Sequence, residues 1–340
     1  MASHRRPKQP SRTRVTVLTA TAAAAVALTS QAAQADPKPS KSEVKAKVDK
    51  LYEEAEKATE KYNGAKEQQE KLEKQVGDLQ DKVARGQDEL NALRDGLGSM
   101  ATAQYRSGGI DPSVQLFLSA DPDDYLSKAS SLDQLSSKQA ESVQKIQAKQ
   151  RSLAQQRAEA TGKLKDLAET RKELASKKKE VQGKLGQAQR LLNSLTASER
   201  AALNEEENRA NRASDRADLG NEKASSGRAA AALSAAQTQL GKPYVSGAEG
   251  PNSYDCSGLT QWSYAQAGVS ISRTTYTQAN DGTRIGRSEL QPGDLVFFSG
   301  LSHVGLYAGN GQVIHAPKPG TVVRYEAMEW AGNFQFGVRI

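Results

Sequence analysis

A long heptad repeat in the first half of the chain constrains the fold more than any other feature. From Val44 to Met100, apolar side chains recur at alternating spacings of four and three, and Gln69 and Gly86 are the two interruptions. Lysine, glutamate, glutamine and aspartate occupy the positions between them. A narrow apolar stripe sustained over eight heptads has to be buried against another helix. The pattern therefore predicts a long coiled-coil helix.

A second, weaker seam runs from Val143 to Leu195, where four polar residues interrupt the apolar positions. Residues 105–128 separate the two seams and contain strong helix breakers, namely Gly108, Gly109, Pro112 and Pro122. The simplest assembly is an antiparallel helical hairpin over 36–203 with its tip at 105–128. Parallel pairing of two chains through the first seam is the alternative. The hairpin serves as a spacer or, through the apolar run VQLFL at 114–118, as a docking element.

The first 35 residues have the three parts of a secretory signal peptide. Five basic residues precede an apolar run at 15–29, and Ala33 and Ala35 then form a small-residue cleavage site. The apolar run is shorter than the roughly 20 residues that a membrane-spanning helix needs. We therefore expect cleavage after Ala35, an extracytoplasmic mature protein and no stable membrane span in that protein.

The distribution of charge argues against a nucleic-acid-binding protein. The formal net charge is +7, but residues 1–35 carry +5 of it, and residues 241–340 hold seven basic and seven acidic side chains. The mature chain therefore lacks the strongly basic surface that nucleic-acid binding requires.

The composition changes near residue 230. Residues 204–228 have small and charged side chains without a heptad, which predicts a linker. Residues 229–340 contain both tryptophans and most of the phenylalanines. Two helices, at 229–240 and from Cys256 onward, precede four strand-like runs at 294–298, 303–308, 312–316 and 321–326. Helices gathered before a mostly antiparallel sheet predict an α+β domain.

The chain contains a single cysteine, so an internal disulfide is impossible. Cys256 follows Asp255 at the expected start of a helix, where Asp255 would cap the helix and free backbone N–H groups would favour the thiolate. His303 and His315 are the two histidines of the mature chain. The three residues together favour a nucleophile with a histidine base. A zinc site, a buried structural thiol and an intermolecular disulfide are the alternatives.

The spacing of the two histidines makes a geometric prediction. The segment HVGLYAGNGQVIHA reads as a β-hairpin that turns at 309–311. A three-residue loop would pair Gly305 with His315 and place His303 and His315 on one face as diagonal neighbours. A plain two-residue turn at Asn310-Gly311 would put them on opposite faces. A cooperating pair therefore requires an odd loop or a bulge, and His315 would then fix the tautomer of His303.

Four motifs in the last third of the chain resemble the NlpC/P60 family of papain-like cysteine peptidases. They are GKPYVSGAEGPNSYDCSGLTQWSY, LQPGDLVFF, HVGLYAG and VIHAP. The resemblance implies a papain-like domain over 229–340 in which Cys256 is the nucleophile, His303 the base and His315 the third polar residue. It also implies substrate or oxyanion contacts from Tyr244, Asp255 and Ser257. Members are mostly bacterial cell-wall hydrolases, which implies a peptidoglycan stem peptide as substrate, cut between D-glutamate and diaminopimelate through a thioester without metal or cofactor.

The front half is similar to the coiled-coil regions of Rip-type, PcsB-type and CwlO-type peptidoglycan hydrolases. That resemblance implies an arm that restrains or delivers the catalytic domain, with a membrane regulator of the FtsE–FtsX type as a partner. Two other functions stay open at this point. One is a wall amidase or acyltransferase on the same fold, and the other is a non-catalytic coiled-coil scaffold with a wall-binding domain.

Overall fold

The computed structural model describes residues 39–340 except 107–113, 115–117 and 119–121. The predicted signal peptide at 1–35 and most of the predicted hairpin tip lie outside the described residues. None of the helices in the described part of the chain is both long enough and apolar enough to cross a membrane.

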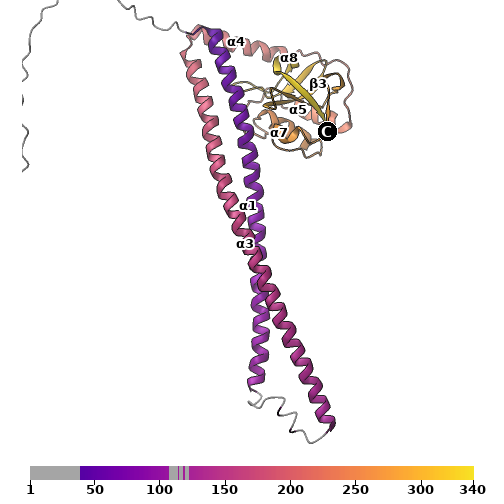
Figure 1. Ribbon diagram of the computed structural model, residues 1–340. Helices are drawn as coiled ribbons and strands as arrows, with labels where there is room; N and C mark the ends of the chain where they lie inside the picture. The colour runs from indigo at the N-terminus through magenta and orange to yellow at the C-terminus, as the bar shows by residue number, and fades with distance from the viewer. Residues whose placement is uncertain (1–38, 107–113, 115–117, 119–121) are drawn as a thin grey trace, which may run out of the picture. The chain divides into compact units, whose positions relative to one another are not determined.

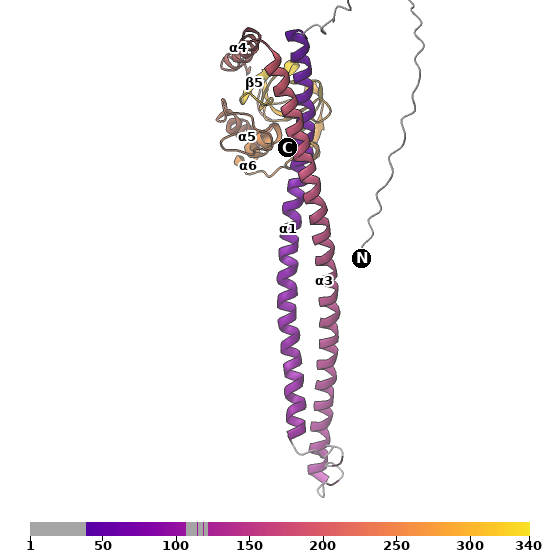
Figure 2. The same cartoon turned by 90° about the vertical axis from the view of Figure 1, so that its left-hand side faces the viewer.

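Two long helices form the front half, as Figures 1 and 2 show. Helix α1 spans Lys41–Arg106 and helix α3 spans Pro122–Ser194. Ion pairs between them join Glu54 to Lys184 and Glu73 to Arg171, so residue numbers rise along one helix as they fall along the other. The predicted antiparallel hairpin is therefore confirmed.

The buried apolar side chains of α1 follow the predicted seam: Val44, Val48, Ala55, Ala58, Ala65, Leu72, Val76, Leu79 and Leu90. Four buried polar side chains of α1 do not belong to it, namely Glu56, Thr59, Glu60 and Asn63. Their burial comes from the C-terminal domain, which packs against this part of the helix.

Helix α4, Ala197–Ser214, begins in the last residues of the predicted hairpin (36–203) and continues into the segment predicted as a linker (204–228). The side chain of Thr196 accepts from the backbone N–H of Glu199, and the Glu199 carboxylate accepts from the backbone N–H of Thr196, which forms a capping box. The Oγ of Ser214 accepts from the backbone N–H of Tyr325 at 2.7 Å, so the helix end is tied to the C-terminal domain.

The C-terminal domain contains a six-stranded antiparallel sheet in the order β1-β6-β2-β3-β4-β5. Its strands are β1 Thr283–Ile285, β2 Leu295–Phe298, β3 His303–Gly309, β4 Gln312–His315, β5 Arg324–Ala327 and β6 Phe334–Arg339. Strands β2, β3 and β4 coincide with predicted runs to within one residue, and β5 begins three residues later than the run predicted at 321–326. Strands β1 and β6 had no prediction. The fold is thus the predicted α+β class.

Helices α5 (Gly227–Gln237) and α6 (Cys256–Gln266) pack on one face of the sheet. The core between them includes Leu233, Leu259, Tyr264, Leu306 and Ile314. Each such apolar side chain contributes about 2 kcal/mol when it is buried. The shorter helical segments are α7 Thr275–Gln278, η1 Arg287–Glu289 and α8 Met328–Ala331.

The β3–β4 hairpin has the register that places His303 and His315 on the same face of the sheet. The turn has two residues, Asn310 and Gly311, and both have positive φ, at 49° and 68°. Two-residue turns of this kind suit the twist of paired strands. The register shifts between Tyr307 and Gly309, and beyond that bulge Leu306 pairs with Ile314. The bulge therefore restores the pairing that places the two histidines on one face.

Candidate active site

Cys256 is the first residue of α6, and Asp255 is its N-cap. The Asp255 carboxylate accepts from the backbone N–H of Gly258 at 2.7 Å. Gly258 has no room for a side chain, because a Cβ there would lie 2.2 Å from the carbonyl oxygen of Ala248. The close loop and the cap together hold the thiol at the start of the helix, as the sequence predicted.

The thiol is nevertheless not activated in this conformation. Cys256 is 2% exposed, and burial raises its pKa well above the usual value. The carboxylates of Glu60, Asp255 and Glu56 raise the pKa further, while a hydrogen bond with the backbone of Val304 acts in the opposite direction. The expected thiolate is therefore opposed by two glutamates of α1, which no local pattern around Cys256 could reveal.

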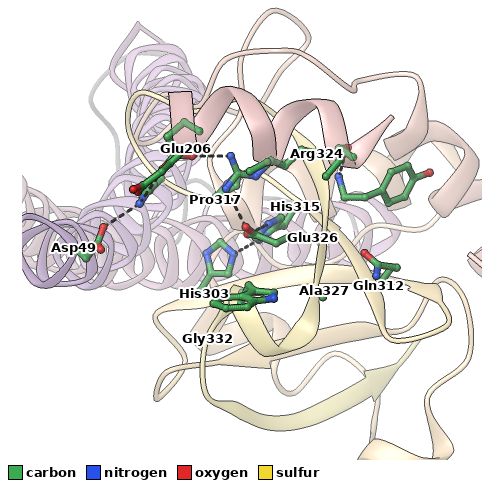
Figure 3. Close-up of a pocket in the computed structure, with 18 of the residues that line it drawn as sticks. Asp49, Glu206, His303, Gln312, His315, Pro317, Arg324, Glu326, Ala327 and Gly332 are labelled. Carbon is green, nitrogen blue, oxygen red and sulfur yellow. Dashed lines mark hydrogen bonds and ion pairs between the residues drawn. The ribbon is translucent and has the colours of Figure 1, made fainter. Parts of the chain in front are cut away.

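His303 and His315 lie side by side, as Figure 3 shows. The Nε2 of His303 is 2.8 Å from the Nδ1 of His315. The Nδ1 of His303 is buried without a hydrogen-bond partner among the described residues. Burial, and next the neighbouring His315, lower the pKa of His303 to about 3, so its ring is neutral near pH 7.

The Glu326 carboxylate contacts His315 on the side of the ring that faces away from His303. The Nε2 of His315 is 3.0 Å from Oε2 of Glu326, and Oε1 of Glu326 accepts from Arg324 at 3.0 Å. Burial raises the pKa of Glu326, but the hydrogen bond from His315 and the charge of Arg324 outweigh it and lower that pKa to about 2. Glu326 is therefore ionised near pH 7.

Asp255 and Ser257 belong to a buried polar network around Arg273. Arg273 donates to both carboxylate oxygens of Asp255, at 3.1 and 2.8 Å, and to Oγ of Ser257 at 2.7 Å. Tyr244 is also buried and belongs to the same cluster of buried residues as Cys256. The six predicted site residues thus lie in one region of the C-terminal domain.

Helix α1 inserts carboxylates into this region. Oε1 of Glu60 accepts from Oγ of Ser257 at 2.7 Å and lies 3.9 Å from the Sγ of Cys256. Its Oε2 accepts from the backbone N–H of Thr275 at 2.6 Å. Glu56 approaches His303, with 3.7 Å between its Oε1 and the Nδ1 of the ring.

Asn63 completes the contact, since its amide donates to Asp255 at 3.0 Å. Burial first, and then Asp255, raise the pKa of Glu60 to about 7, and burial and Glu60 raise the pKa of Glu56. One face of α1 therefore occupies the space in front of the thiol.

A cavity of about 930 Å³ opens beside the histidine pair. Side chains from α1, α4, β4, β5 and α8 line it, and Figure 3 shows several of them. His303 and His315 reach the cavity and Trp330, 80% exposed, stands at its edge, but Cys256 is not among its lining residues. In this conformation the cavity therefore gives access to the histidines and not to the thiol.

The alternatives for the cysteine can now be weighed. Among the described residues, no group of three or more histidine, cysteine, aspartate or glutamate side chains is arranged to hold a metal ion. The burial of Cys256 also removes it from contact with a second chain in this conformation. Two hydrogen-bonded histidines in the same region as a buried thiol are instead the arrangement expected of a nucleophile and its base.

Sequence reasoning missed four groups at the site: Glu56, Glu60, Arg273 and Glu326. The two α1 glutamates look like ordinary polar positions of a heptad. Glu326 had a usable signal, because its strand pairs with the strand of His315 and Arg324 lies directly opposite that histidine.

The C-terminal domain is similar to a known protein family and to several known proteins. The family model described as "NlpC/P60 family" matches residues 241–335. A probable endopeptidase of Corynebacterium glutamicum is 50% identical over 101 residues, which is 29% of this chain and 48% of that protein. The probable endopeptidase p60 of Listeria innocua is 47% identical over 109 residues, 31% of this chain and 23% of that protein.

Among solved structures, the NlpC/p60 domain of the peptidoglycan hydrolase SagA is 37% identical, with a TM-score of 0.31, and the match covers 33% of this chain and 98% of that one. The chain spans less than half the length of the curated relatives it matches. Residues 241–335 are therefore an NlpC/P60 domain.

Proposed function

We propose that the protein is a secreted peptidoglycan hydrolase, a cysteine endopeptidase that cuts the stem peptide at the D-glutamyl–diaminopimelate bond. The observation that carries this proposal is the combination of a thiol at the start of α6 with a paired, neutral histidine at the start of β3. Its relatives, called probable endopeptidases, and the peptidoglycan hydrolase SagA support the substrate class.

The residues fit the steps of acyl transfer. The Nδ1 of His303 has no hydrogen-bond partner among the described residues, so in the tautomer with its proton on Nε2 it can accept the proton of the Cys256 thiol when the two meet. The thiolate then attacks the scissile carbonyl carbon, and a backbone N–H at the start of α6 stabilises the oxyanion. Collapse of this intermediate breaks the C–N bond, His303 returns the proton to the leaving amine, and water hydrolyses the thioester.

The test is a digestion of purified peptidoglycan and defined muropeptides, read by mass spectrometry. The full chain should release fragments that end in D-glutamate, and Cys256→Ala should release none. Cleavage at the lactyl amide, or transfer of an acyl group to an added amine, would instead identify an amidase or acyltransferase. Wall binding that survives Cys256→Ala, with no hydrolysis by the full chain or by the released variant Glu60→Ala, would identify a scaffold.

Secretion belongs to the same proposal. It rests on the basic, apolar and small-residue segments of residues 1–35. N-terminal sequencing of the protein from a culture supernatant or cell-wall fraction should begin at Asp36. A mature protein that still begins at Met1 would contradict it.

We also propose that the structure represents a restrained enzyme. Glu60 and Asn63 hold the polar groups that flank Cys256, so a stem peptide enters only after α1 leaves. A membrane complex of the FtsE–FtsX type that pulls on the hairpin is the candidate partner. Adding such a complex in vesicles should stimulate the full chain and leave Glu60→Ala, which is already released, unchanged. Equal stimulation of both would contradict this role.

A further inference from the structure

We propose that Glu326 is a positioning residue that sets the tautomers of both histidines, and so makes His303 a base. The inference rests on the proposed function and names a residue for which neither the motifs nor the family match gives a role. It is carried by three consecutive contacts at 2.8–3.0 Å, from Arg324 to Glu326, from Glu326 to His315 and from His315 to His303. The Nδ1 of His303, at the end of this line, is buried without a hydrogen-bond partner among the described residues.

The direction of each hydrogen bond follows from chemistry alone. Arginine can only donate, and an ionised carboxylate can only accept. Glu326 therefore accepts from Arg324 through Oε1 and from His315 through Oε2, so a His315 ring that carries one proton carries it on Nε2.

The same logic continues along the line. With its proton on Nε2, His315 offers a bare Nδ1, which accepts from His303 Nε2 over 2.8 Å. The proton of neutral His303 is then on Nε2, and its Nδ1 carries a free lone pair. That Nδ1 is the buried nitrogen without a hydrogen-bond partner among the described residues. A thiol proton can be received only there.

Without Glu326, two neutral imidazoles can point their protons either way. In the reverse arrangement, His315 donates from Nδ1 and the proton of His303 moves to Nδ1, where it blocks transfer from Cys256. A wrong tautomer of this kind disables a histidine base without disturbing its position. Glu326 removes the ambiguity, and Arg324 fixes the carboxylate that does so.

Arg324 makes the glutamine variant diagnostic. In Glu326→Gln, Arg324 still requires an acceptor, so the amide oxygen turns to Arg324 and the NH₂ group faces His315. His315 then has to accept at Nε2, and the whole line reverses. Glu326→Met provides neither donor nor acceptor, so it leaves both arrangements open.

The rank order of activities is therefore unusual. We expect Glu326→Gln to lower kcat by on the order of 10²-fold with little change in KM, since the lost base resembles a triad with the wrong tautomer. Glu326→Met should lose about tenfold or less, although it is the larger chemical change. In Arg324→Met/Glu326→Gln the amide is free to turn, and activity should rise about tenfold above Glu326→Gln. Glu329→Gln, an exposed glutamate of α8, is the matched control and should behave as wild type.

A spectroscopic measurement separates this inference from the proposed function. The chain has three histidines, so ¹⁵N-histidine spectra of the full chain can be assigned by substitution. Wild type should show protonated Nε2 on His303 and His315, and Glu326→Gln should show protonated Nδ1 on both. This result holds whether or not the protein cleaves peptidoglycan.

Two outcomes would overturn the inference. One is a Glu326→Gln protein that keeps protonated Nε2 on His303. The other is a Glu326→Met protein that is folded by its histidine spectrum and is less active than Glu326→Gln, since a purely structural side chain would give that order.

Discussion

Replacing Glu60 with alanine should release the active site from α1. The Glu60 carboxyl group accepts two hydrogen bonds in the closed conformation, from Ser257 Oγ at 2.7 Å and from the N–H of Thr275 at 2.6 Å, whereas the Oγ1 of Thr275 donates to the Leu301 carbonyl oxygen at 2.6 Å. In Glu60→Ala these donors stay buried without the partner while α1 remains in place. They are rehydrated only when α1 moves away.

The size of the effect follows from those contacts. A buried hydrogen bond contributes about 1 kcal/mol net, and leaving a buried donor unsatisfied costs a similar amount or more. Two hydrogen bonds therefore stabilise the closed form by about 2 kcal/mol, which corresponds to roughly 30-fold in the ratio of closed to open molecules. The rise in activity is limited by the open fraction of wild type, so at least a tenfold increase is expected if wild type is mostly closed.

The effect should also depend on pH. Burial and the charge of Asp255 raise the pKa of Glu60 to about 7 in the closed form, whereas in an open, hydrated form it returns toward 4.5. The closed form thus binds a proton that the open form lacks. Its advantage is fully present below about pH 4.5 and is lost as the pH rises through about 7, by up to tenfold per unit.

The other titratable groups near Glu60 either also favour the closed form at low pH or keep the same charge between pH 5 and 8. Burial and the nearby Glu60 raise the pKa of Glu56, so its protonation also favours the closed form at low pH. Arg273 and Lys318 are cations on the facing domain and remain charged over this range. Burial lowers the pKa of His303 to about 3, so it stays neutral from pH 5 to 8.

The assay is the rate of Cys256 alkylation by iodoacetamide in the full chain from pH 5 to 8, with peptidoglycan hydrolysis measured in parallel. Glu60→Ala should react at least tenfold faster than wild type at pH 5.5, and the gap should narrow by pH 8. Glu60→Gln keeps the acceptor without a charge, so it should stay slow at every pH. Glu70→Ala, an exposed glutamate on the same helix, controls for the change in helix propensity and charge.

Two results would refute the reasoning. Equal alkylation of wild type and Glu60→Ala at pH 5.5 would mean that α1 does not shield the thiol. A Glu60→Gln protein as reactive as Glu60→Ala would mean that the hydrogen bonds do not hold the helix.

Two further predictions concern stability and are measured by urea unfolding of the full chain. Arg273→Met should destabilise the catalytic domain by about 3 kcal/mol or more, because it leaves the buried carboxylate of Asp255 without its cation; a loss below 1 kcal/mol would contradict the role of this pair. Gly258→Ala should cost at least about 2 kcal/mol, since its Cβ would lie 2.2 Å from the Ala248 carbonyl oxygen, whereas Gly77→Ala on α1, with open space around it, should be neutral or slightly stabilising.

Local patterns predicted the parts of the fold whose cause is local. The heptad fixes which residues of α1 are buried against α3, and Asp255 marks the start of α6. The shared face of His303 and His315 requires an odd register, and the bulge between Tyr307 and Gly309 provides it. The exact device, a two-residue turn with a bulge, depends on small differences between turns that a sequence pattern does not encode.

The missed features all depend on contacts between distant segments. Strand β6 lies between β1 and β2, so its pairing is decided by strands about 40 to 55 residues earlier in the chain. Glu60 is 215 residues from Thr275, and no sequence pattern around either residue predicts their contact. A heptad predicts which face of a helix is apolar but says nothing of what covers its polar face.

The chemistry of the α1 contact favours a reversible restraint over a permanent part of the fold. Its closest contacts at the site are polar and come from Glu60, Asn63 and Glu56, so α1 can leave without exposing a large apolar surface at this point. The ion pair between Lys66 and Glu249 is about two-fifths exposed on both sides and therefore contributes little. The proposed restraint then rests on a few buried carboxyl and amide groups together with the partly exposed ion pair of Asp49 and Lys318. We expect a force on the hairpin or the loss of the Glu60 proton to shift it. The same glutamates that block the groove also raise the pKa of the Cys256 thiol. Movement of α1 would therefore admit the substrate and activate the nucleophile in one step.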